Sequence, residues 1–322
     1  MKRILSGVQA TGKIHMGNYF GAIKQFVDLG ASNDAFYMIA DLHSITTVQD
    51  KETLRENIFN VALDYLALGI DPEKSVIFRQ SDVSAHTELT WIFNCLTTMP
   101  YLMRAHAFKD SEAKSKEVNV GLFDYPVLMS ADILLYRPDI VPVGEDQKQH
   151  IEYARDIAEK FNRIYGDTFT LPEEYIIEEV GTIPGIDGRK MSKSYKNHIP
   201  LFAERDEIEK LIMGIVTDSK TPEEIKETDG DTLFTLHSLV SPPEVLGKVE
   251  EGYKNGGMGY GEVKKLLAES MDSFISPMRE KRSLLANDRD YVLGVLEDGA
   301  KAAHEEADVV MREVKEKVGL SL

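Results

Sequence analysis

Five consecutive residues, Lys190 to Ser194, have the chemistry to bind phosphate groups. The segment reads Lys-Met-Ser-Lys-Ser and follows a Gly-Ile-Asp-Gly turn at residues 185–188. Lysine ammonium groups and serine hydroxyls donate hydrogen bonds, and the ammonium groups add the positive charge that attracts phosphates. The whole chain has a formal net charge of -17 at pH 7, so this loop is a local cationic feature. The alternative interpretation is an ordinary lysine-rich surface turn.

A second candidate for anion binding lies near the N-terminus, at residues 6–22. A predicted strand ends at Gly7 and a predicted helix opens near Asn18, so backbone N–H groups and the helix dipole face the space above the sheet. His15 and Asn18 add side chains that can donate hydrogen bonds, and Gly17 permits the close approach of a base or a ribose. The glycine spacing matches neither the dinucleotide fingerprint nor the Walker loop. The alternative is an ordinary turn with a surface His15 and a capping Asn18.

An acidic residue, Asp132, lies within an otherwise apolar helical run at residues 125–136. Burying an ionised carboxylate is costly unless a hydrogen-bond donor meets it. An indole N–H is a suitable donor, and a pocket built around that contact would reject a side chain without the N–H group. The alternative is a helix acid paired with a nearby arginine such as Arg137.

Strand and helix patterns alternate in the part of the chain that holds these residues. The predicted strands are residues 3–7, 35–40, 75–80 and 139–144. The predicted helices are residues 18–27, 53–69, 84–96, 125–136 and 145–166, the last beginning at Glu145 or Asp146. The charged segment 104–119 has little periodicity and is predicted to be a surface insertion or mobile loop. This order predicts an α/β fold with a doubly wound, Rossmann-like parallel sheet that binds ligands at the carboxyl ends of its strands.

From about residue 199 the strand signals fade and the pattern is helical to Leu322. We therefore predict a Rossmann-like domain at residues 1–198 and an all-helical domain at residues 199–322. The only cysteine, Cys95, excludes an intramolecular disulfide, and the Cys/His clusters of zinc sites are missing, so we expect a reducing compartment and no bound metal. No apolar run approaches the ~20 residues of a membrane span, which predicts a cytoplasmic protein without a membrane partner. The acidic charge balance argues against binding nucleic acid through a broad basic surface.

The two candidate phosphate-binding segments together resemble the signature pair of the class I aminoacyl-tRNA synthetases. His-Met-Gly-Asn at residues 15–18 is similar to the first motif, and Lys190–Ser194 matches the second motif at every position. The resemblance implies that the lysine loop folds over ATP, a substrate bound with Mg²⁺, while an amino-acid carboxylate attacks the α-phosphate. It places His15 and Asn18 near the α- and β-phosphates, and Lys190 and Lys193 near the β- and γ-phosphates. Such pre-aligned donors stabilise the charge that develops on the departing pyrophosphate.

Within class I, residues 122–136, 139–147 and 144–150 resemble the tryptophanyl-tRNA synthetases of bacterial type. The resemblance runs from Arg3 to about Ser219. It implies activation of L-tryptophan by ATP to tryptophanyl-adenylate, release of pyrophosphate, and transfer of the tryptophanyl group to the 3′ end of tRNA(Trp). The tryptophan-binding residues that it implies are Leu5, His43, Tyr125, Met129, Asp132, Val141, Val143 and Gln147. The ATP-binding residues that it implies are Gln9, Ala10, Thr11, Gly17, Asn18, Gly144, Glu145, Asp146, Ile183, Lys190, Met191, Ser192, Lys193 and Ser194.

Two positions depart from the family pattern. Residue 5 is leucine where relatives carry an aromatic side chain, and Ser111 stands where the family places a phosphate-seeking lysine. The neighbouring lysines Lys109, Lys114 and Lys116 lie in the same segment, and none of them is assigned the role. Two implied residues also have simpler interpretations, because Asp146 can cap a helix and His43 can be a satisfied core histidine. The resemblance further implies a homodimer in which the C-terminal helical part recognises the anticodon.

Three other functions are compatible with parts of this pattern. A tyrosine-specific synthetase has the same fold, and the segment 144–147 (GEDQ) together with Asp132 argues against it. A nucleotidyltransferase that never meets tRNA is disfavoured by the complete lysine loop and by the added helical domain. A synthetase-like regulator that binds RNA or an amino acid without catalysis would normally have lost His15, Asn18 or the loop lysines, and all are present.

Overall fold

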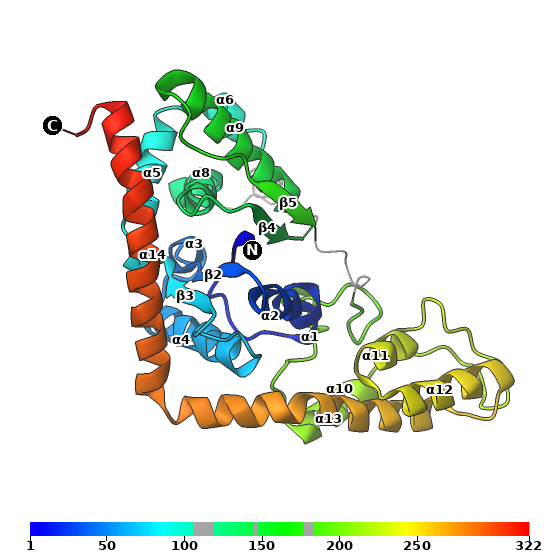
Figure 1. Cartoon of the computed structure of the whole chain (residues 1–322). Helices are drawn as coiled ribbons and strands as arrows, with labels where there is room; N and C mark the ends of the chain where they lie inside the picture. The colour runs from blue at the N-terminus through cyan, green and yellow to red at the C-terminus, as the bar shows by residue number, and fades with distance from the viewer. Residues whose placement is uncertain (106–118, 145–146, 177–182, 322) are drawn as a thin grey trace. The chain divides into compact units, whose positions relative to one another are not determined.

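Five parallel strands form the centre of the fold (Figure 1). The computed structural model describes residues 1–105, 119–144, 147–176 and 183–321. The strands are β1 (Arg3–Val8), β2 (Asp34–Ile39), β3 (Ser75–Arg79), β4 (Ile140–Val143) and β5 (Glu173–Ile176). Their order in the sheet is β3-β2-β1-β4-β5, so the winding direction changes between β1 and β4. A doubly wound sheet of this kind opens a crevice for ligands at the carboxyl ends of the two strands where the order changes.

Helices connect the strands and are the main elements of the described residues after the sheet. Those between the strands are α1 (Met16–Asn18), the π-helical η1 (Tyr19–Ile23), α2 (Lys24–Gly30), α3 (Asp41–Ser44), α4 (Lys51–Ala67), the 3-10 helix η2 (Gln80–Asp82), α5 (Ala85–Asn94), α6 (Met99–Leu102), α8 (Val120–Leu134) and α9 (Lys148–Tyr165). After the sheet come the 3-10 helix η4 (Lys193–Tyr195), α10 (Arg205–Met213), α11 (Thr232–Val240), α12 (Pro243–Asn255), α13 (Tyr260–Ala286) and α14 (Arg289–Val318). The predicted α/β class with a helical C-terminal region is confirmed.

The four predicted strands are confirmed as β1 to β4, and one strand was not predicted from the sequence. β5 has exposed residues at Glu173, Glu174 and Tyr175, and it forms the edge of the sheet. Because an exposed edge strand needs no run of apolar side chains, the sequence pattern gives no signal for it. α8 begins at Val120, before the predicted residue 125, because the Asn119 side chain accepts a hydrogen bond from the Leu122 N–H (2.8 Å) and caps the helix.

Two of the sequence predictions fall partly or wholly on residues outside the described ranges. Residues 106–118 of the predicted insertion are among them, including Ser111 and the neighbouring lysines. Residues 145–146, where the sequence predicted the start of a helix, are also outside, and α9 begins at Lys148.

The chain divides into two compact units. Unit 1 comprises Met1–Gly12, Gln25–Ile177 and Asp288–Leu322, and unit 2 comprises Lys13–Lys24 and Glu178–Asn287. The sheet lies in unit 1, together with α14 at the C-terminal end of the chain. The domain boundary predicted at residue 198 stays a prediction. The two compact units have other boundaries.

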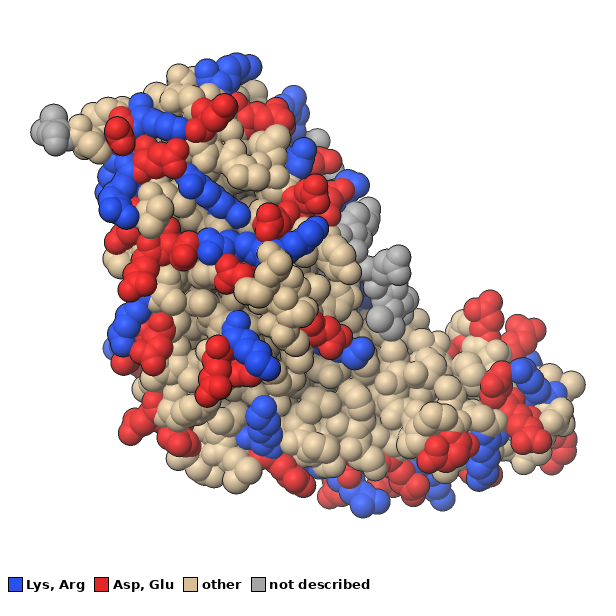
Figure 2. All heavy atoms as spheres, in the orientation of Figure 1, with Lys and Arg blue, Asp and Glu red and all other residues tan. Residues whose placement is uncertain are grey.

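The surface carries charges of both signs. On the face shown in Figure 2, lysines and arginines lie among aspartates and glutamates. Among the described residues, no helix combines the length and the apolar character needed to cross a bilayer.

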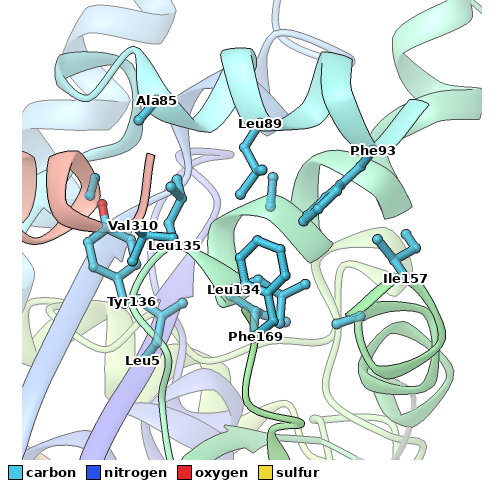
Figure 3. Packing of buried hydrophobic residues seen from close by; sticks show 14 of the residues in the cluster. Leu5, Ala85, Leu89, Phe93, Leu134, Leu135, Tyr136, Ile157, Phe169 and Val310 are labelled. Carbon is cyan, nitrogen blue, oxygen red and sulfur yellow. The ribbon is translucent and has the colours of Figure 1, made fainter. Parts of the chain in front are cut away.

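The core of unit 1 lies between the sheet and its covering helices. Leu5 of β1, Leu134 and Tyr136 at the end of α8, and Val310 of α14 belong to one buried cluster (Figure 3). α14 also packs against β3, α5 and α4 (Figure 1). The helix that closes the chain is therefore part of the hydrophobic core of the sheet unit.

In unit 2, α13 packs against α10 and α11. The segment that contains η1 joins this packing, because the ring of Phe20 stacks on that of Phe274 in α13, with 5.6 Å between the ring centroids. Unit 2 thus combines a short N-terminal segment with helices α10 to α13.

We predict that Gly299→Ala destabilises unit 1. A Cβ atom at Gly299 of α14 would lie 1.9 Å from the carbonyl oxygen of Ile77 in β3, so the helix must move away from the strand. Overpacking of this kind lowers the free energy of unfolding by about 1–3 kcal/mol. Chemical denaturation followed by circular dichroism measures the change.

The matched control is Gly294→Ala in the same helix. A Cβ atom there meets no atom within 4 Å, and alanine stabilises a helix by up to about 1 kcal/mol relative to glycine. Equal stability of the two variants would contradict the close packing of α14 on β3.

Candidate active site

The lysine loop extends from a narrow two-stranded turn. The Met191 N–H donates to the Ile183 carbonyl oxygen (2.9 Å), and the Gly185 N–H donates to the Arg189 carbonyl oxygen (2.7 Å). Gly188 closes the turn with a φ of 79°, a left-handed conformation that favours glycine. Lys190 and Ser194 are exposed, Ser192 and Lys193 are half-buried, and the side chains of Met191 and Ile183 are buried. The loop therefore keeps its polar groups at the surface while two apolar side chains anchor it.

A buried asparagine, Asn197, holds the loop together from behind. Its Oδ1 accepts a hydrogen bond from the Ser192 N–H (2.8 Å), and its Nδ2 donates to Asp187 Oδ1 (2.7 Å) and to the Lys190 carbonyl oxygen (3.1 Å). The hydrogen bond from Asn197, followed by those from Arg189, lowers the pKa of Asp187 to about 2. These hydrogen bonds of Asn197, which we call the clasp, fix the backbone on both sides of Met191 through neutral amide groups.

The N-terminal candidate segment, which contains His15 and Asn18, lies directly beside this loop in unit 2. The Met16 N–H donates to the Ile199 carbonyl oxygen (3.0 Å), and the Leu201 N–H donates to the Ile14 carbonyl oxygen (3.1 Å). The Gly17 N–H also lies 3.3 Å from the sulfur of Met191, which is a weak acceptor. The structure therefore brings together two motifs that are separated by more than half of the chain.

His15 caps the short helix that follows it. Its Nδ1 accepts a hydrogen bond from the Asn18 N–H (3.3 Å), while the Asn18 side-chain oxygen accepts one from the His15 N–H (3.2 Å). Burial, and then the charges of Lys193 and His198, lowers the pKa of His15 to about 4. The imidazole is consequently neutral at pH 7, and because Nδ1 accepts, the proton resides on Nε2. That N–H is available to a ligand beside the lysine loop.

The other residues expected near ATP follow strands of unit 1. Gln9 and Thr11, which are exposed, and the buried Ala10 follow β1, and the Ala10 N–H donates to Ser44 Oγ (2.8 Å). Gly144 follows β4, the neighbour of β1 in the sheet. These residues lie at the carboxyl ends of the two strands where the sheet order changes. Glu145 and Asp146 lie outside the described residues.

Asp132 is buried at 2 % exposure and accepts three hydrogen bonds from side chains. His43 Nε2 lies 2.7 Å from Oδ2, while Gln80 Nε2 and His86 Nδ1 each lie 2.7 Å from Oδ1. Burial raises the pKa of Asp132, but the charge and hydrogen bonds of His43 and His86 outweigh burial and lower it to about 2. The site holds an ionised carboxylate without an arginine or a lysine. The alternative partner Arg137 is wrong, because its guanidinium pairs with Glu313.

The remaining residues expected around tryptophan gather in the same unit. Tyr125 lies with its ring centroid 6.2 Å from that of His43, and its hydroxyl is 2.9 Å from His150 Nε2. Leu5, Val141 and Val143 belong to the buried cluster, with Met129 packed against it. Gln147 is the N-cap residue of α9. The ionised Asp132 thus contacts His43, whose ring lies near that of Tyr125, and strands β1 and β4 of the same unit supply apolar side chains.

Several residues of this arrangement were missed by the sequence analysis. They are Ser44, Gln80, His86, Tyr136, His150 and Asn197. Gln80 carried a signal, because it ends a predicted parallel strand and strands of a doubly wound sheet place such residues at the ligand edge. Asn197 follows the lysine loop closely, but nothing in the sequence distinguishes it from a surface asparagine. Among the described residues, no group of three histidine, cysteine or acidic side chains is arranged to hold a metal ion.

We predict that His15 stays neutral down to about pH 4 and that Lys193→Ala raises its pKa. The chain has eight histidines, so a His15→Gln variant is used to assign the NMR signal of His15 before its Cε1–H shift is titrated. The pKa of His15 is 6.5 in the unfolded chain and about 4 in the folded chain, so the unfolded chain takes up a proton first as the pH falls. His15 therefore lowers the free energy of unfolding progressively between pH 6.5 and pH 4 and has no such effect above pH 6.5.

Lys210→Ala, at an exposed lysine of α10 in the same unit, is the control and should leave the titration of His15 unchanged. A His15 pKa that does not respond to Lys193→Ala would mean that the loop does not lie beside the turn in solution.

Comparison with known proteins places this geometry in a family. A family model described as tRNA synthetases class I (W and Y) matches residues 1–276. A tryptophan–tRNA ligase from Rhodopirellula baltica is 50 % identical over 318 residues, which cover 99 % of each chain. A tryptophan–tRNA ligase from Fusobacterium nucleatum is 48 % identical over 321 residues, which cover 99 % of this chain and 98 % of the relative.

A crystal structure gives the same result. Tryptophanyl-tRNA synthetase from Campylobacter jejuni, in complex with ADP and tryptophan, superposes with a TM-score of 0.93 at 44 % identity and covers 98 % of this chain and 99 % of that chain. Since the family model spans most of the sequence and these relatives match it over nearly their full length, the chain belongs to the class I tRNA synthetases of the tryptophan and tyrosine (W and Y) family.

Proposed function

We propose that this chain is a tryptophan–tRNA ligase. It activates L-tryptophan with MgATP to form tryptophanyl-adenylate, releases pyrophosphate, and transfers the tryptophanyl group to the 3′ end of tRNA(Trp). The observation that carries the activation step is the backbone pairing of residues 14–16 with residues 199–201, which holds His15 beside the lysine loop. The relatives named above support the same reaction, since they are named tryptophan–tRNA ligases and match this chain over nearly their full length.

In the activation step, the chain mainly stabilises charge. The tryptophan carboxylate attacks the α-phosphate, the bond between the α- and β-phosphates breaks, and negative charge accumulates on the leaving pyrophosphate. The neutral Nε2–H of His15 and the amide of Asn18 donate to phosphate oxygens. Lys190 and Lys193 attract the β- and γ-phosphates, and the Mg²⁺ that accompanies ATP shares this role. Donors and cations that are aligned before the reaction lower the barrier because they require no reorganisation as charge develops.

The other ATP contacts are those that the resemblance to the class I synthetases implies. Gln9, Ala10 and Thr11 approach the phosphates, and Gly144, Glu145 and Asp146 meet the ribose. Ile183 and Met191 supply apolar contact to adenine, while Gly17 permits close approach of the nucleotide. The backbone and hydroxyl groups of Ser192 and Ser194 complete the loop around the phosphates. The complex of the Campylobacter jejuni synthetase with ADP supports an adenine nucleotide as the ligand.

Tryptophan is selected through the indole N–H, which donates to Asp132. The carboxylate is ionised, and its three protein donors leave it room for one more, since a carboxylate offers about four acceptor positions. Leu5, His43, Met129, Val141 and Val143 surround the ring, and Tyr125 and Gln147 hold the ammonium and carboxylate groups. The presence of tryptophan in the Campylobacter jejuni complex supports this specificity over tyrosine.

The protein acts on tRNA as a homodimer in the cytoplasm, with residues 1–198 as the activating domain and the helical domain 199–322 reading the anticodon. Trp91 (71 % exposed), Met99 (63 %) and Val120 (80 %) support a second subunit, because they expose large apolar side chains on α5, α6 and the contacting α8. Sedimentation equilibrium tests this point, and a mass of one chain at micromolar concentration would contradict it.

The experiment that tests the function is amino-acid-dependent exchange of labelled pyrophosphate into ATP, run with each of the twenty amino acids and without tRNA. Exchange with tryptophan alone is expected. Exchange with tyrosine would mean that the enzyme activates tyrosine in place of tryptophan by the same mechanism. Absence of exchange with every amino acid would favour a regulator without catalytic activity. Addition of tRNA(Trp) to the active enzyme then tests transfer and separates the ligase from an enzyme that only makes adenylates.

We predict that Lys193→Ala lowers the kcat for exchange by roughly 10²-fold, which is the scale for losing one transition-state donor. The KM for tryptophan should stay nearly unchanged. The physical reason is that Lys193 meets charge that appears only as pyrophosphate departs. Exchange kinetics at saturating ATP, with tryptophan varied, measure both constants.

Lys196→Asn is the matched control, because it removes a charge from the same loop and asparagine tolerates the left-handed backbone at φ 54°. The control should exchange at nearly the wild-type rate. A large rise in the KM for tryptophan with an unchanged kcat in Lys193→Ala would exclude the assigned role.

A further inference from the structure

Two buried polar residues near Asp132, His86 and Tyr136, have no role in the proposed reaction. His86 and Tyr136 are both 0 % exposed, and the Tyr136 hydroxyl lies 2.9 Å from His86 Nε2. The other ring nitrogen of His86, Nδ1, lies 2.7 Å from Asp132 Oδ1. The three side chains therefore form a chain of hydrogen bonds from Tyr136 to the carboxylate.

The acceptor character of Asp132 determines which atoms around it carry protons. An ionised carboxylate only accepts hydrogen bonds, so each nitrogen that faces it is a donor. The orientation of the Gln80 amide is fixed independently, because its Oε1 accepts from the N–H groups of Leu42 (3.1 Å) and His43 (3.4 Å). Its Nε2 is consequently the atom that donates to Oδ1. His43 likewise carries a proton on Nε2, which faces Oδ2.

A neutral His86 fits this arrangement in only one tautomer. A neutral imidazole has one N–H donor and one acceptor nitrogen, and donation from Nδ1 to Asp132 leaves Nε2 as the acceptor. Burial, and then the charge of Asp132, raises the pKa of Tyr136, so its hydroxyl keeps its proton. With Nδ1 of a neutral His86 donating to Asp132, this hydroxyl is the donor to Nε2, 2.9 Å away. The opposite tautomer would direct the lone pair of Nδ1 at a carboxylate oxygen, which is repulsive.

We infer that Tyr136 and His86 are positioning residues for substrate specificity. The Tyr136 hydroxyl fixes the tautomer of His86, and the His86 N–H fixes the orientation of Asp132, whose Oδ2 then accepts the indole N–H of the substrate. The inference rests on the proposed function and deepens it, because it assigns the specificity to two residues that do not touch the substrate.

The distribution of donors over the two oxygens explains why the orientation matters. Oδ1 already accepts from Gln80 and His86, whereas Oδ2 accepts only from His43. The remaining acceptor position is therefore on Oδ2, beside His43, whose ring centroid lies 6.2 Å from that of Tyr125. If His86 no longer donates, only Gln80 and His43 hold the carboxylate, and its remaining lone pair is aimed less strictly at the substrate. The titratable side chains that face Asp132 are His43 from α3, His86 from α5 and Tyr136 after α8.

The test compares tryptophan with an analogue in which sulfur replaces the indole N–H, β-(3-benzothienyl)alanine. Pyrophosphate exchange gives kcat/KM for each compound, and their ratio reports how much the enzyme gains from the N–H group. We expect Tyr136→Phe and His86→Leu to lower this ratio by about 10-fold, the scale of one hydrogen bond to a charged group. A merely structural role would lower kcat/KM equally for both compounds and leave the ratio unchanged.

A second pair of variants tests the tautomer itself. In His86→Asn, the amide nitrogen takes the place of Nδ1 and always carries hydrogen, so the ratio should remain near that of the wild type. Adding Tyr136→Phe to His86→Asn should then have no effect on the ratio, since an amide has no tautomer to fix. Tyr65→Phe, which removes another hydroxyl from the core of unit 1, is the control for stability and should leave the ratio unchanged.

The protonation of His86 can also be observed directly. Nitrogen-15 NMR of the imidazole, assigned with the His86→Asn variant, should show a proton on Nδ1 in the wild type and a changed pattern in Tyr136→Phe. An unchanged ratio in active Tyr136→Phe would overturn the inference, as would an imidazolium signal for wild-type His86 or a Tyr136→Phe effect of equal size in the His86→Asn background. If the wild type does not use tryptophan, the proposed function fails, and this result is distinct from failure of the inference.

Discussion

The cost of burying the charge on Asp132 determines much of the organisation of unit 1. A carboxylate removed from water must receive hydrogen bonds, and here the donors come from α3, η2 and α5, while Asp132 itself is on α8. Each donor has to be held at hydrogen-bonding distance, so the carboxylate joins elements that are far apart in sequence. None of these donors is an arginine or a lysine, so the carboxylate is held by hydrogen bonds from histidine and glutamine side chains. An additional N–H donor is therefore the natural complement of this site.

The same physical constraint acts on His15 in unit 2, with the opposite outcome. Burial and the charges of Lys193 and His198 disfavour the protonated imidazole, so the residue is neutral and offers a directed N–H group. A protonated histidine would repel the lysines of the adjacent loop. The backbone hydrogen bonds between residues 14–16 and 199–201 keep these groups close, because they do not depend on the charge state of any side chain. Neutrality of His15 thus permits two lysines and a histidine to share one small region.

The sequence predicted the elements and motifs whose information is local. Strands β1 to β4 were visible because they are short apolar runs, and the lysine loop was visible because its five residues are consecutive. β5 was invisible because an exposed edge strand has no apolar pattern. The partners of Asp132 could not be predicted, since His86, Gln80 and His43 lie 46, 52 and 89 positions away along the chain. Nothing in a single sequence specifies which of many polar residues meet at such distances. The alternative partner Arg137, the nearest cation in the sequence, is therefore wrong.

The lysine loop illustrates why neutral groups hold charged ones in this protein. Asn197 binds the backbone of Ser192 and Lys190 with its amide and leaves the ammonium groups of the loop outside the clasp. A carboxylate in place of this amide would compete with phosphate for the lysines, and a cation would repel them. The one acid that the clasp contacts, Asp187, is engaged by Asn197 and Arg189, so its negative charge is directed toward these donors. The amide of Asn197 therefore fixes the backbone of the loop without adding a charge of its own beside Lys190 and Lys193.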